Sequence, residues 1–473
     1  EILRCLVGSE MCIRDRESGI KIKWDTMVAA DWSDKKSVLV ASGDLPDAFL
    51  GSNTFTDSEI AQNQNMFIPL EDLIKDNMPN LNKAFEKEPK LKAMVTNPDG
   101  HIYSLPKKLP MRPIVGNQLF INKKWLDNLG LKMPETYDEL VTVLQAFKDK
   151  DANGNGDVND EIPFGSGNFD PTFSYILPFN NRLGGDNTYE MSVKDGKPVY
   201  LRTEESYKQG IAAMHEAYKK GLIDPELFTE DTSMSVAKRM DKGVARVGVS
   251  SGWTADATFG QHASEYAPLP ALKGPDGKQY VISDPDHLNY GRNEILITNK
   301  CKDPAKLLKW LDKFYTDDAS IQNFYGSFGI ATEKDGDKYK VLAPKDGKSA
   351  DEWAWINSLR DFGPKYVSDD INSHVDIDQT QGDGLKLKMD KELKQYALPA
   401  YPNVIYSQEE LNKLSSIYVD INSYVTQQAS KWVVEGGIEK EWDDYKATLK
   451  KMGIDDFMKI QQDAYDRYQK EVK

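Results

Sequence analysis

Residues 151–161 read DANGNGDVNDE and carry the clearest chemical pattern in the chain. Oxygen-bearing side chains recur at alternate positions and two acids close the stretch: Asp151, Asn153, Asn155, Asp157, Asp160 and Glu161. Calcium binds about six to eight oxygens at roughly 2.3–2.6 Å, and glycine permits the sharp bend that gathers them from one loop. The pattern therefore predicts a Ca²⁺ site.

The residues around this loop indicate a structural metal rather than a sensor. The EF-hand pattern is met at its first, third, fifth and sixth places, but Ile162 stands at the twelfth and the acid comes one residue early. Thr136 and Glu139 predict a capping box for the preceding helix, whereas Pro163 prevents an amphipathic helix after the loop. A sensor needs a paired helix to move. The alternative interpretation of residues 151–161 is a solvated Asn/Gly turn that binds no metal.

Several stretches together resemble a known family. Residues 119–130 (LFINKKWLDNLG) lead through 134–136 (PET) to the loop and to 161–163 (EIP), while 41–47 (ASGDLPD) and 464–468 (AYDRY) add an early loop and a terminal helix. This combination resembles the family 1 extracellular solute-binding proteins of bacterial ABC importers, particularly the large lipoprotein branch of Gram-positive bacteria. The resemblance spans residues 17–473.

The first sixteen residues stand apart from that resemblance. Residues 1–16 (EILRCLVGSEMCIRDR) resemble a translated sequencing-adapter segment, without an initiating Met or a signal peptide. Cys5 is no lipobox cysteine, because Arg4 stands where a small residue is required. We therefore expect a non-native prefix, with the natural signal peptide, the anchoring cysteine and the family's first β-strand missing.

Composition narrows the class of protein. The 473 residues are 39% hydrophobic, which suits two domains with full cores. The net charge of −15 argues against nucleic acid or anionic membranes as partners. Without the prefix, Cys301 is alone, so no intrachain disulfide and no thiolate metal site is expected.

Alternating helical and strand patterns predict an α/β fold with a mostly helical C-terminal region. The resemblance implies a two-lobe, periplasmic-binding-protein-like fold with a hinged cleft, whose chain crosses between lobes near residues 113, 284 and 330. Lobe one would then hold residues 17–112 and 285–330, and lobe two residues 113–284 and 331–473.

Sugar-binding sites need aromatic faces and polar groups, and Trp253 is the strongest candidate. It follows the predicted strand 244–250 and the turn Ser251-Gly252, at the start of a helix. Ligands of open α/β sheets bind at such strand ends, and the resemblance implies that a Trp here stacks on sugar. The other candidates lie near the crossovers, at a strand end, after the calcium loop or in the later helical region: Ser52, Arg112, Asn117, Phe169, Tyr290, Arg292, Trp353 and Trp355.

Two alternatives come from other classes. Residues 248–252 (GVSSG) match Gly-x-Ser-x-Gly, so a serine hydrolase using Ser250 is conceivable, with His262, His287 or His374 as a partner. The sequence has no oxyanion loop of the HGGG type and no His pair for zinc. The third possibility is a calcium-dependent surface adhesin.

The favoured hypothesis is an extracellular receptor of an ABC importer and not an enzyme. It would capture a carbohydrate, in particular an oligosaccharide, by hinge closure and pass it to the permease subunits. The resemblance implies a monomeric cell-surface lipoprotein anchored to the cytoplasmic membrane, stabilised by structural Ca²⁺.

Overall fold

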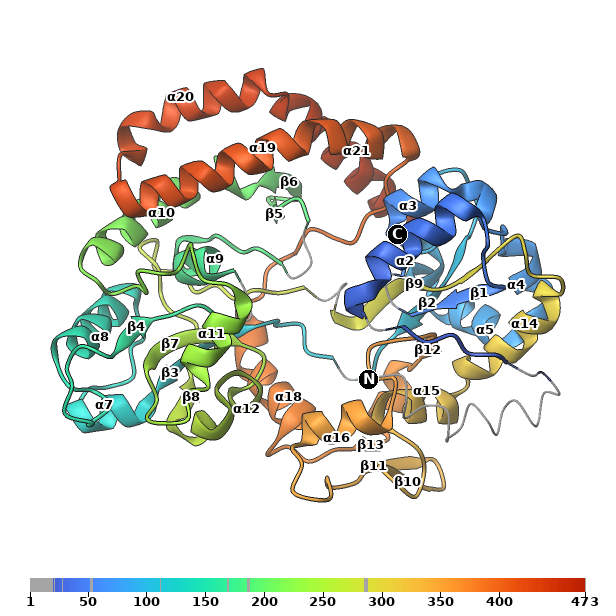
Figure 1. Ribbon diagram of the computed structural model, residues 1–473, viewed down its shortest axis with the longest axis horizontal. Helices are drawn as coiled ribbons and strands as arrows, with labels where there is room; N and C mark the ends of the chain where they lie inside the picture. Colours follow the sequence, from blue (N-terminus) through green and yellow to red (C-terminus); the bar gives the residue numbers. More distant parts are fainter. Residues whose placement is uncertain are drawn as a thin grey trace.

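The structure is a computed structural model that describes residues 20, 22–27, 29–51, 54–110, 112–167, 170–184, 188–284 and 288–472. Figure 1 shows two lobes side by side, with the long C-terminal helices (red) above them. Within the described ranges each lobe is centred on its own four-stranded sheet. The predicted α/β class with two lobes is confirmed.

The sheet of lobe one has the strand order β1-β9-β2-β12. It consists of β1 (Ala48–Leu50), β9 (Tyr290–Ile297), β2 (Ser104–Lys108) and β12 (Lys365–Tyr366). The central strand β9 runs antiparallel to β1 and β2, and β12 is parallel to β2. The apolar end of β9, Ile295 to Ile297, is buried in the lobe.

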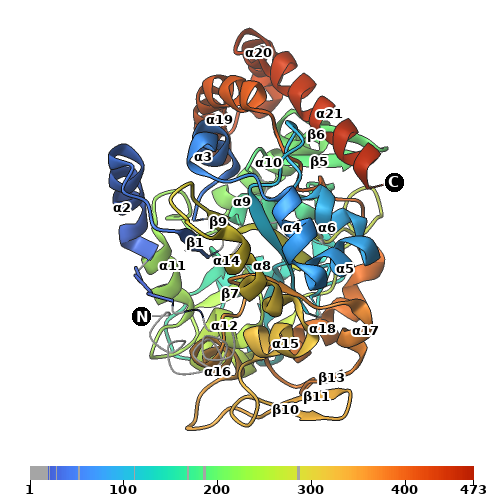
Figure 2. The ribbon, with the colours of Figure 1, turned by 90° about the vertical axis from the view of Figure 1, so that its right-hand side faces the viewer.

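The helices of lobe one cover this sheet, as a quarter turn of the molecule shows for α4, α5, α6 and α14 (Figure 2). They are α2 (Ala29–Ser42), α3 (Asp57–Gln62), α4 (Glu71–Asn77), α5 (Pro79–Lys87), α6 (Pro89–Ala93), α14 (Pro304–Leu311) and α15 (Asp317–Tyr325). Helix α14 begins as the sequence predicts, because the Asp303 side chain accepts a hydrogen bond from the Lys306 N–H and Pro304 occupies the first turn.

The sheet of lobe two has the order β4-β7-β3-β8. It consists of β4 (Ile162–Phe164), β7 (Val247–Gly252), β3 (Gln118–Asn122) and β8 (Tyr266–Pro268). Strand β7 pairs parallel with β4 and antiparallel with β3. β7 is thus an inner strand of the sheet, and Trp253 follows directly after its carboxyl end.

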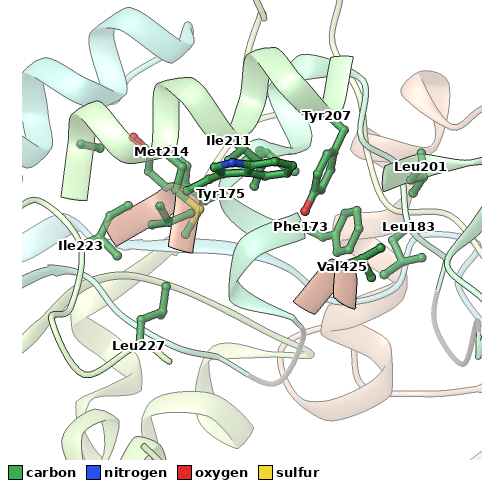
Figure 3. Packing of buried hydrophobic residues seen from close by; sticks show 14 of the residues in the cluster. Phe173, Tyr175, Leu183, Leu201, Tyr207, Ile211, Met214, Ile223, Leu227 and Val425 are labelled. Atoms are coloured by element: carbon green, nitrogen blue, oxygen red, sulfur yellow. The ribbon is translucent and has the colours of Figure 1, made fainter. Parts of the chain in front are cut away.

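Helices and one hairpin surround the second sheet. They are α7 (Lys123–Leu129), α8 (Tyr137–Asp149), α9 (Pro171–Ile176), α10 (Glu205–Lys219), α11 (Thr232–Arg239), α12 (Ala255–Phe259), β5 (Met191–Lys194) and β6 (Lys197–Tyr200). The predicted Thr136–Glu139 capping box of α8 is present. Figure 3 shows Tyr207, Ile211 and Met214 of α10 packed in the core, as their helical spacing predicts.

The C-terminal helices belong to the same core. They are α19 (Gln408–Glu435), α20 (Ile438–Lys451) and α21 (Ile454–Glu471), and α20 turns into α21 at Gly453 with φ +95°. Trp432 and Trp442 are buried with Tyr207 in one cluster. Among the helices of the described ranges, none combines the length and the hydropathy needed to cross a bilayer.

The segment after residue 330 differs from the predicted boundaries, which placed residues 331–473 in lobe two. Strand β12 extends the sheet of lobe one, and Tyr339 shares a core with Phe324 of α15. The next helix, α18 (Gly382–Leu393), packs on lobe two through Met389 and Phe259. The chain therefore changes lobes between residues 376 and 382. The sequence did not indicate this boundary, because a two-residue strand such as β12 gives no signal of the sheet it joins.

This connecting region holds the remaining elements. They are β10 (Thr332–Asp335), β11 (Lys338–Val341), β13 (Val375–Asp376), α16 (Ala350–Asn357) and α17 (Asp369–Ser373). The three strands form a small sheet in the order β10-β11-β13 within the described ranges. Figure 1 shows this sheet, α16 and α18 below the gap between the two lobes.

Two glycines of β7 are required by close packing. A Cβ on Gly248 would lie 2.6 Å from a ring carbon of Phe147 and 2.8 Å from the carbonyl oxygen of Pro163. A Cβ on Gly252 would lie 1.8 Å from the Thr258 hydroxyl oxygen. The small residues of β7 therefore let α8 and α12 approach the strand, and this approach fixes the end of β7 at Trp253.

We expect Gly252→Ala to lower the free energy of unfolding by about 1–3 kcal/mol, because the added methyl overpacks the contact with Thr258. Urea denaturation measures the change. Gly116→Ala is the matched control, because the nearest atom to its added Cβ is 3.9 Å away. Equal stability of the two variants would contradict this account of β7.

Candidate functional site

A cavity of about 300 Å³ lies between the end of β7 in lobe two and the connecting region 340–383. Trp253 and Trp353, both predicted from the sequence as ligand contacts, line it together. The lining also includes polar and charged side chains, namely Thr254, Tyr325, Lys340, Arg360, Asp376, Asp378, Gln381 and Asp383. Aromatic faces with polar groups between them suit a ligand that has both C–H patches and hydroxyls.

Each tryptophan lies close to the N-cap of a helix. Trp253 lies between β7 and Thr254, whose hydroxyl caps α12 by accepting from the Ala257 N–H. Trp353 lies in the first turn of α16, where the Ser349 hydroxyl accepts from the Glu352 N–H at 3.1 Å. Both indoles are half-buried. The Trp353 N–H is buried without an acceptor among the described residues, so it remains available as a donor.

Two arginines and an aspartate form a buried ionic junction beside the cavity. Arg112, from the first crossover, pairs with Asp361 and lies 3.6 Å from Asp383. Arg360 pairs with the other oxygen of Asp383 at 2.9 Å. Burial alone would raise the pKa of Asp383, but Arg360 and Arg112 lower it below the ordinary value. Asp383 is therefore a carboxylate, as required for joining two guanidinium groups.

Two cations face the indole of Trp253. The Arg112 guanidinium carbon lies 5.4 Å from the ring centroid, and the Lys386 Nζ lies 4.7 Å from it. Lys386 is 1% exposed and donates a 2.5 Å hydrogen bond to the Gly116 carbonyl. Burial lowers the pKa of Lys386 to about 7, although the Asp390 carboxylate opposes this fall. The charge above Trp253 therefore depends on pH near neutrality.

The predicted calcium loop forms a compact turn between α8 and β4. The Asp151 carboxylate accepts from the N–H groups of Gly154, Asn155 and Gly156 at 2.7, 3.0 and 2.8 Å. Asn153 and Asn155 donate through their side-chain amides to Asp160 at 3.0 and 2.8 Å. No helix follows, since β4 begins at Ile162. The side chains of Asp151, Asn153 and Asn155 thus hydrogen-bond within the loop, whereas Asp157 is exposed and accepts from the Asn159 N–H.

The donor set of this loop fits a hard cation. Within the described ranges, no group of three or more His, Cys, Asp and Glu side chains is gathered as a metal site. The loop, however, adds the amide oxygens of Asn153 and Asn155 to its carboxylates, and calcium accepts both kinds of oxygen. Glu161 is 5% exposed, and its Oε2 is buried without a hydrogen-bond donor. Burial raises the pKa of this carboxyl, which a bound cation would reverse.

Comparison with known proteins decides the family. The model of the family described as bacterial extracellular solute-binding protein matches residues 14–321, more than half of the chain. The chain belongs to this family. The family predicted from residues 41–47, 119–163 and 464–468 is confirmed.

Relatives of this solute-binding protein span nearly all of its length. The fructooligosaccharide ABC transporter substrate-binding protein FusA of Streptococcus pneumoniae is 34% identical over 96% of this chain and 86% of its own. Its structure with kestose has a TM-score of 0.82 at 33% identity, covering 97% of this chain and 95% of that one. The structure of its EF-hand mutant with fructo-nystose also has a TM-score of 0.82, at 32% identity and the same coverage.

A Bifidobacterium longum infantis protein gives a similar match. It is an HMO-binding, ABC-transporter-associated solute-binding protein. The identity is 28%, the TM-score is 0.83, and the match covers 97% of this chain and 94% of that chain.

The other predicted contacts of this solute-binding protein lie away from the cavity lining. The Tyr290 hydroxyl donates to Glu88 in lobe one. Arg292 pairs with Asp57 at 2.5 Å and donates to the Val404 carbonyl at 2.9 Å. Trp355 lies 5.8 Å from the ring of Phe362.

Three further predicted contacts complete the set. Asn117 is half-buried just before β3 and is absent from the lining. Ser52 and Phe169 fall outside the described residues. Arg360, Asp383 and Lys386 were not predicted. Asp383 and Lys386 contact the distant residues Arg112, Gly116 and Trp253, and no local pattern indicates that Arg360 pairs with Asp383.

The hydrolase alternative finds no support in the structure of this solute-binding protein. Ser250 is fully buried inside β7, which continues to Gly252, so no strand-to-helix turn presents the serine. Its hydroxyl donates to the Ser166 carbonyl at 2.7 Å. His262 hydrogen-bonds the Asp241 carbonyl at 2.8 Å, and His287 lies outside the described residues. The Gly-x-Ser-x-Gly match follows from the close packing of Gly248 and Gly252.

We expect the emission of Trp253 to titrate with a midpoint near pH 7. The Lys386 ammonium is charged below this pH and neutral above it, and loss of a charge 4.7 Å from the indole changes the local field. The measurement is the difference in emission between the wild type and Trp253→Phe from pH 6 to 9. Lys386→Met should remove the transition. If the emission difference between the wild type and Trp253→Phe does not change with pH, the expected titration is contradicted.

Proposed function

We propose that this chain is the extracellular receptor of an ABC importer and captures an oligosaccharide between its two lobes. The observation that carries the proposal is the cavity between β7–α12 and the connecting region, which both Trp253 and Trp353 line. Kestose, bound by the S. pneumoniae relative, and fructo-nystose, bound by its EF-hand mutant, are the first sugars to test.

The chemistry of the lining supports a neutral, hydroxyl-rich ligand. The indoles of Trp253 and Trp353 offer faces for C–H patches of sugar rings, and Asp376, Asp378 and Gln381 offer acceptors and donors for hydroxyls. Burial raises the pKa of Tyr325, so its phenol is a neutral donor. Because Arg360 is already paired with Asp383, it offers less to an anionic ligand.

Hinge closure would couple these contacts to transport. The walls of the cavity come from both sides of the crossover between residues 376 and 382, so a ligand that touches both walls favours the closed arrangement by its differential affinity. No bond of the ligand is broken in this mechanism. The closed receptor would then deliver the ligand to the permease subunits of the importer.

We further propose the cellular setting that the family resemblance implies. The receptor would act as a monomer outside the cell, held at the cytoplasmic membrane by a lipid anchor. We also propose that the loop 151–161 holds a structural Ca²⁺ through Asp151, Asn153, Asn155, Asp157 and Glu161, with Asp160 as a further carboxylate. The cation would neutralise these acids and fix the end of α8 to β4.

We expect Trp253→Ala and Trp353→Ala each to weaken oligosaccharide binding by about 1–3 kcal/mol, the scale of a buried aromatic contact. Isothermal titration calorimetry with kestose and fructo-nystose measures the affinities. Trp355→Ala is the matched control, because Trp355 lies on the same helix but does not line the cavity. An unchanged affinity in both cavity variants would refute the proposed site.

We expect a chelator to lower the melting temperature by about 2–6 °C while leaving oligosaccharide affinity nearly unchanged, because a metal bound to the folded state adds about 1–3 kcal/mol remote from the cavity. Differential scanning calorimetry measures the shift. Glu161→Gln should lose the response to the chelator, since it keeps an acceptor for the Ala152 N–H and removes the charge. If the chelator leaves the melting temperature of the wild type unchanged, the calcium proposal is contradicted.

A further inference from the structure

One face of α18 holds the first crossover between the lobes. Asp383, Lys386 and Asp390 are spaced by three and four residues, so they lie on the same side of the helix. Asp390 accepts from the N–H groups of Ile114 and Val115 at 3.0 and 2.8 Å. Lys386 donates to the Gly116 carbonyl, and Asp383 lies 3.6 Å from Arg112. The three side chains thus contact residues 112–116 in succession.

The middle residue of this face also touches the cavity wall. The Lys386 ammonium lies 4.7 Å from the Trp253 ring centroid, and Trp253 lines the cavity. Burying a cation is unfavourable without compensation. Among the described residues no carboxylate forms a salt bridge with Lys386, since Asp383 pairs with the two arginines and Asp390 accepts from the crossover N–H groups. The close partners of Lys386 are the crossover carbonyl and the indole, and Asp390 contributes through its charge alone.

We propose that Lys386 is a positioning residue that fixes the Trp253 indole against the first crossover, so that the ring is held in place for the ligand. This inference rests on the proposed oligosaccharide site. The buried ammonium contacts the ring by a cation–π interaction and the crossover by a charge-assisted hydrogen bond. A neutral side chain of similar length would fill the volume, but it would leave the Gly116 carbonyl without this donor and would remove one of the two cations that face the indole.

A double-mutant cycle tests whether Lys386 acts through Trp253. Kestose affinity is measured by calorimetry for the wild type, Lys386→Met, Trp253→Ala and the double variant. We expect Lys386→Met to weaken binding about three- to tenfold in the wild-type background. In the Trp253→Ala background the same change should cost less than twofold, because the ring that Lys386 positions is gone.

Lys365 provides the control for a purely structural role. It is also fully buried, burial also lowers its pKa to about 7, and its ammonium donates to the Gly363 carbonyl at 2.9 Å. It lies in β12 and does not line the cavity. Lys365→Met should lower the melting temperature without changing kestose affinity. Lys386→Arg, which keeps the charge and the donor, should restore most of the affinity that Lys386→Met loses.

The outcomes separate the inference from the proposed function. Two results contradict the positioning role and leave the proposed site supported. In one, Trp253→Ala weakens kestose binding but Lys386→Met does not; in the other, the two losses of affinity are additive. If Trp253→Ala leaves kestose affinity unchanged, the proposed site falls and the positioning role with it. If Lys386→Met fails to fold, the cycle is run with Lys386→Gln, which removes the charge but keeps an N–H donor, and an additive loss there contradicts the inference equally.

Discussion

The shared carboxylate of Asp383 is the interaction on which the arrangement of this receptor depends. It joins Arg112 of the first crossover to Arg360 of the connecting region and stands at the start of α18, which packs on lobe two. An unpaired buried charge would destabilise the fold strongly, so the Asp383 carboxylate requires the guanidinium groups of Arg112 and Arg360. The first crossover and the connecting region, about 250 residues apart in sequence, are thereby held together at the Asp383 carboxylate. The cavity opens beside that point, and Asp383 itself lines it.

The site follows from this junction and from close packing at the end of β7. Gly252 lets α12 approach the strand, which sets the position of Trp253, while the connecting region adds Trp353 to the lining of the same cavity. Because the walls come from parts of the chain on either side of a crossover, ligand contact and lobe closure are coupled physically. The loop 151–161 leads directly into β4, so the Ca²⁺ proposed for it would affect the stability of lobe two rather than the ligand.

Local sequence signals predicted the features that depend on neighbouring residues. The capping box of α8, the buried face of α10, the Asx pattern of the loop and the placement of Trp253 after a strand were all found in this way. Lys386 could not be found, because its contacts Gly116 and Trp253 are distant in sequence. No local pattern indicates that Arg360 and Asp383 pair with each other or that Asp383 meets Arg112. The predicted end of β7, Ser250, lies two residues before the observed end at Gly252. This difference made Ser250 resemble a nucleophile on a turn. The contacts of β12 with lobe one had no local signal either.

The most direct test of the account is a crystal structure of the protein grown with a bound oligosaccharide such as kestose. The account predicts sugar rings between the two lobes, in contact with the indoles of both Trp253 and Trp353, with the Asp383 junction intact. A sugar bound elsewhere on the molecule, with both indoles turned away from it, would contradict the central claim.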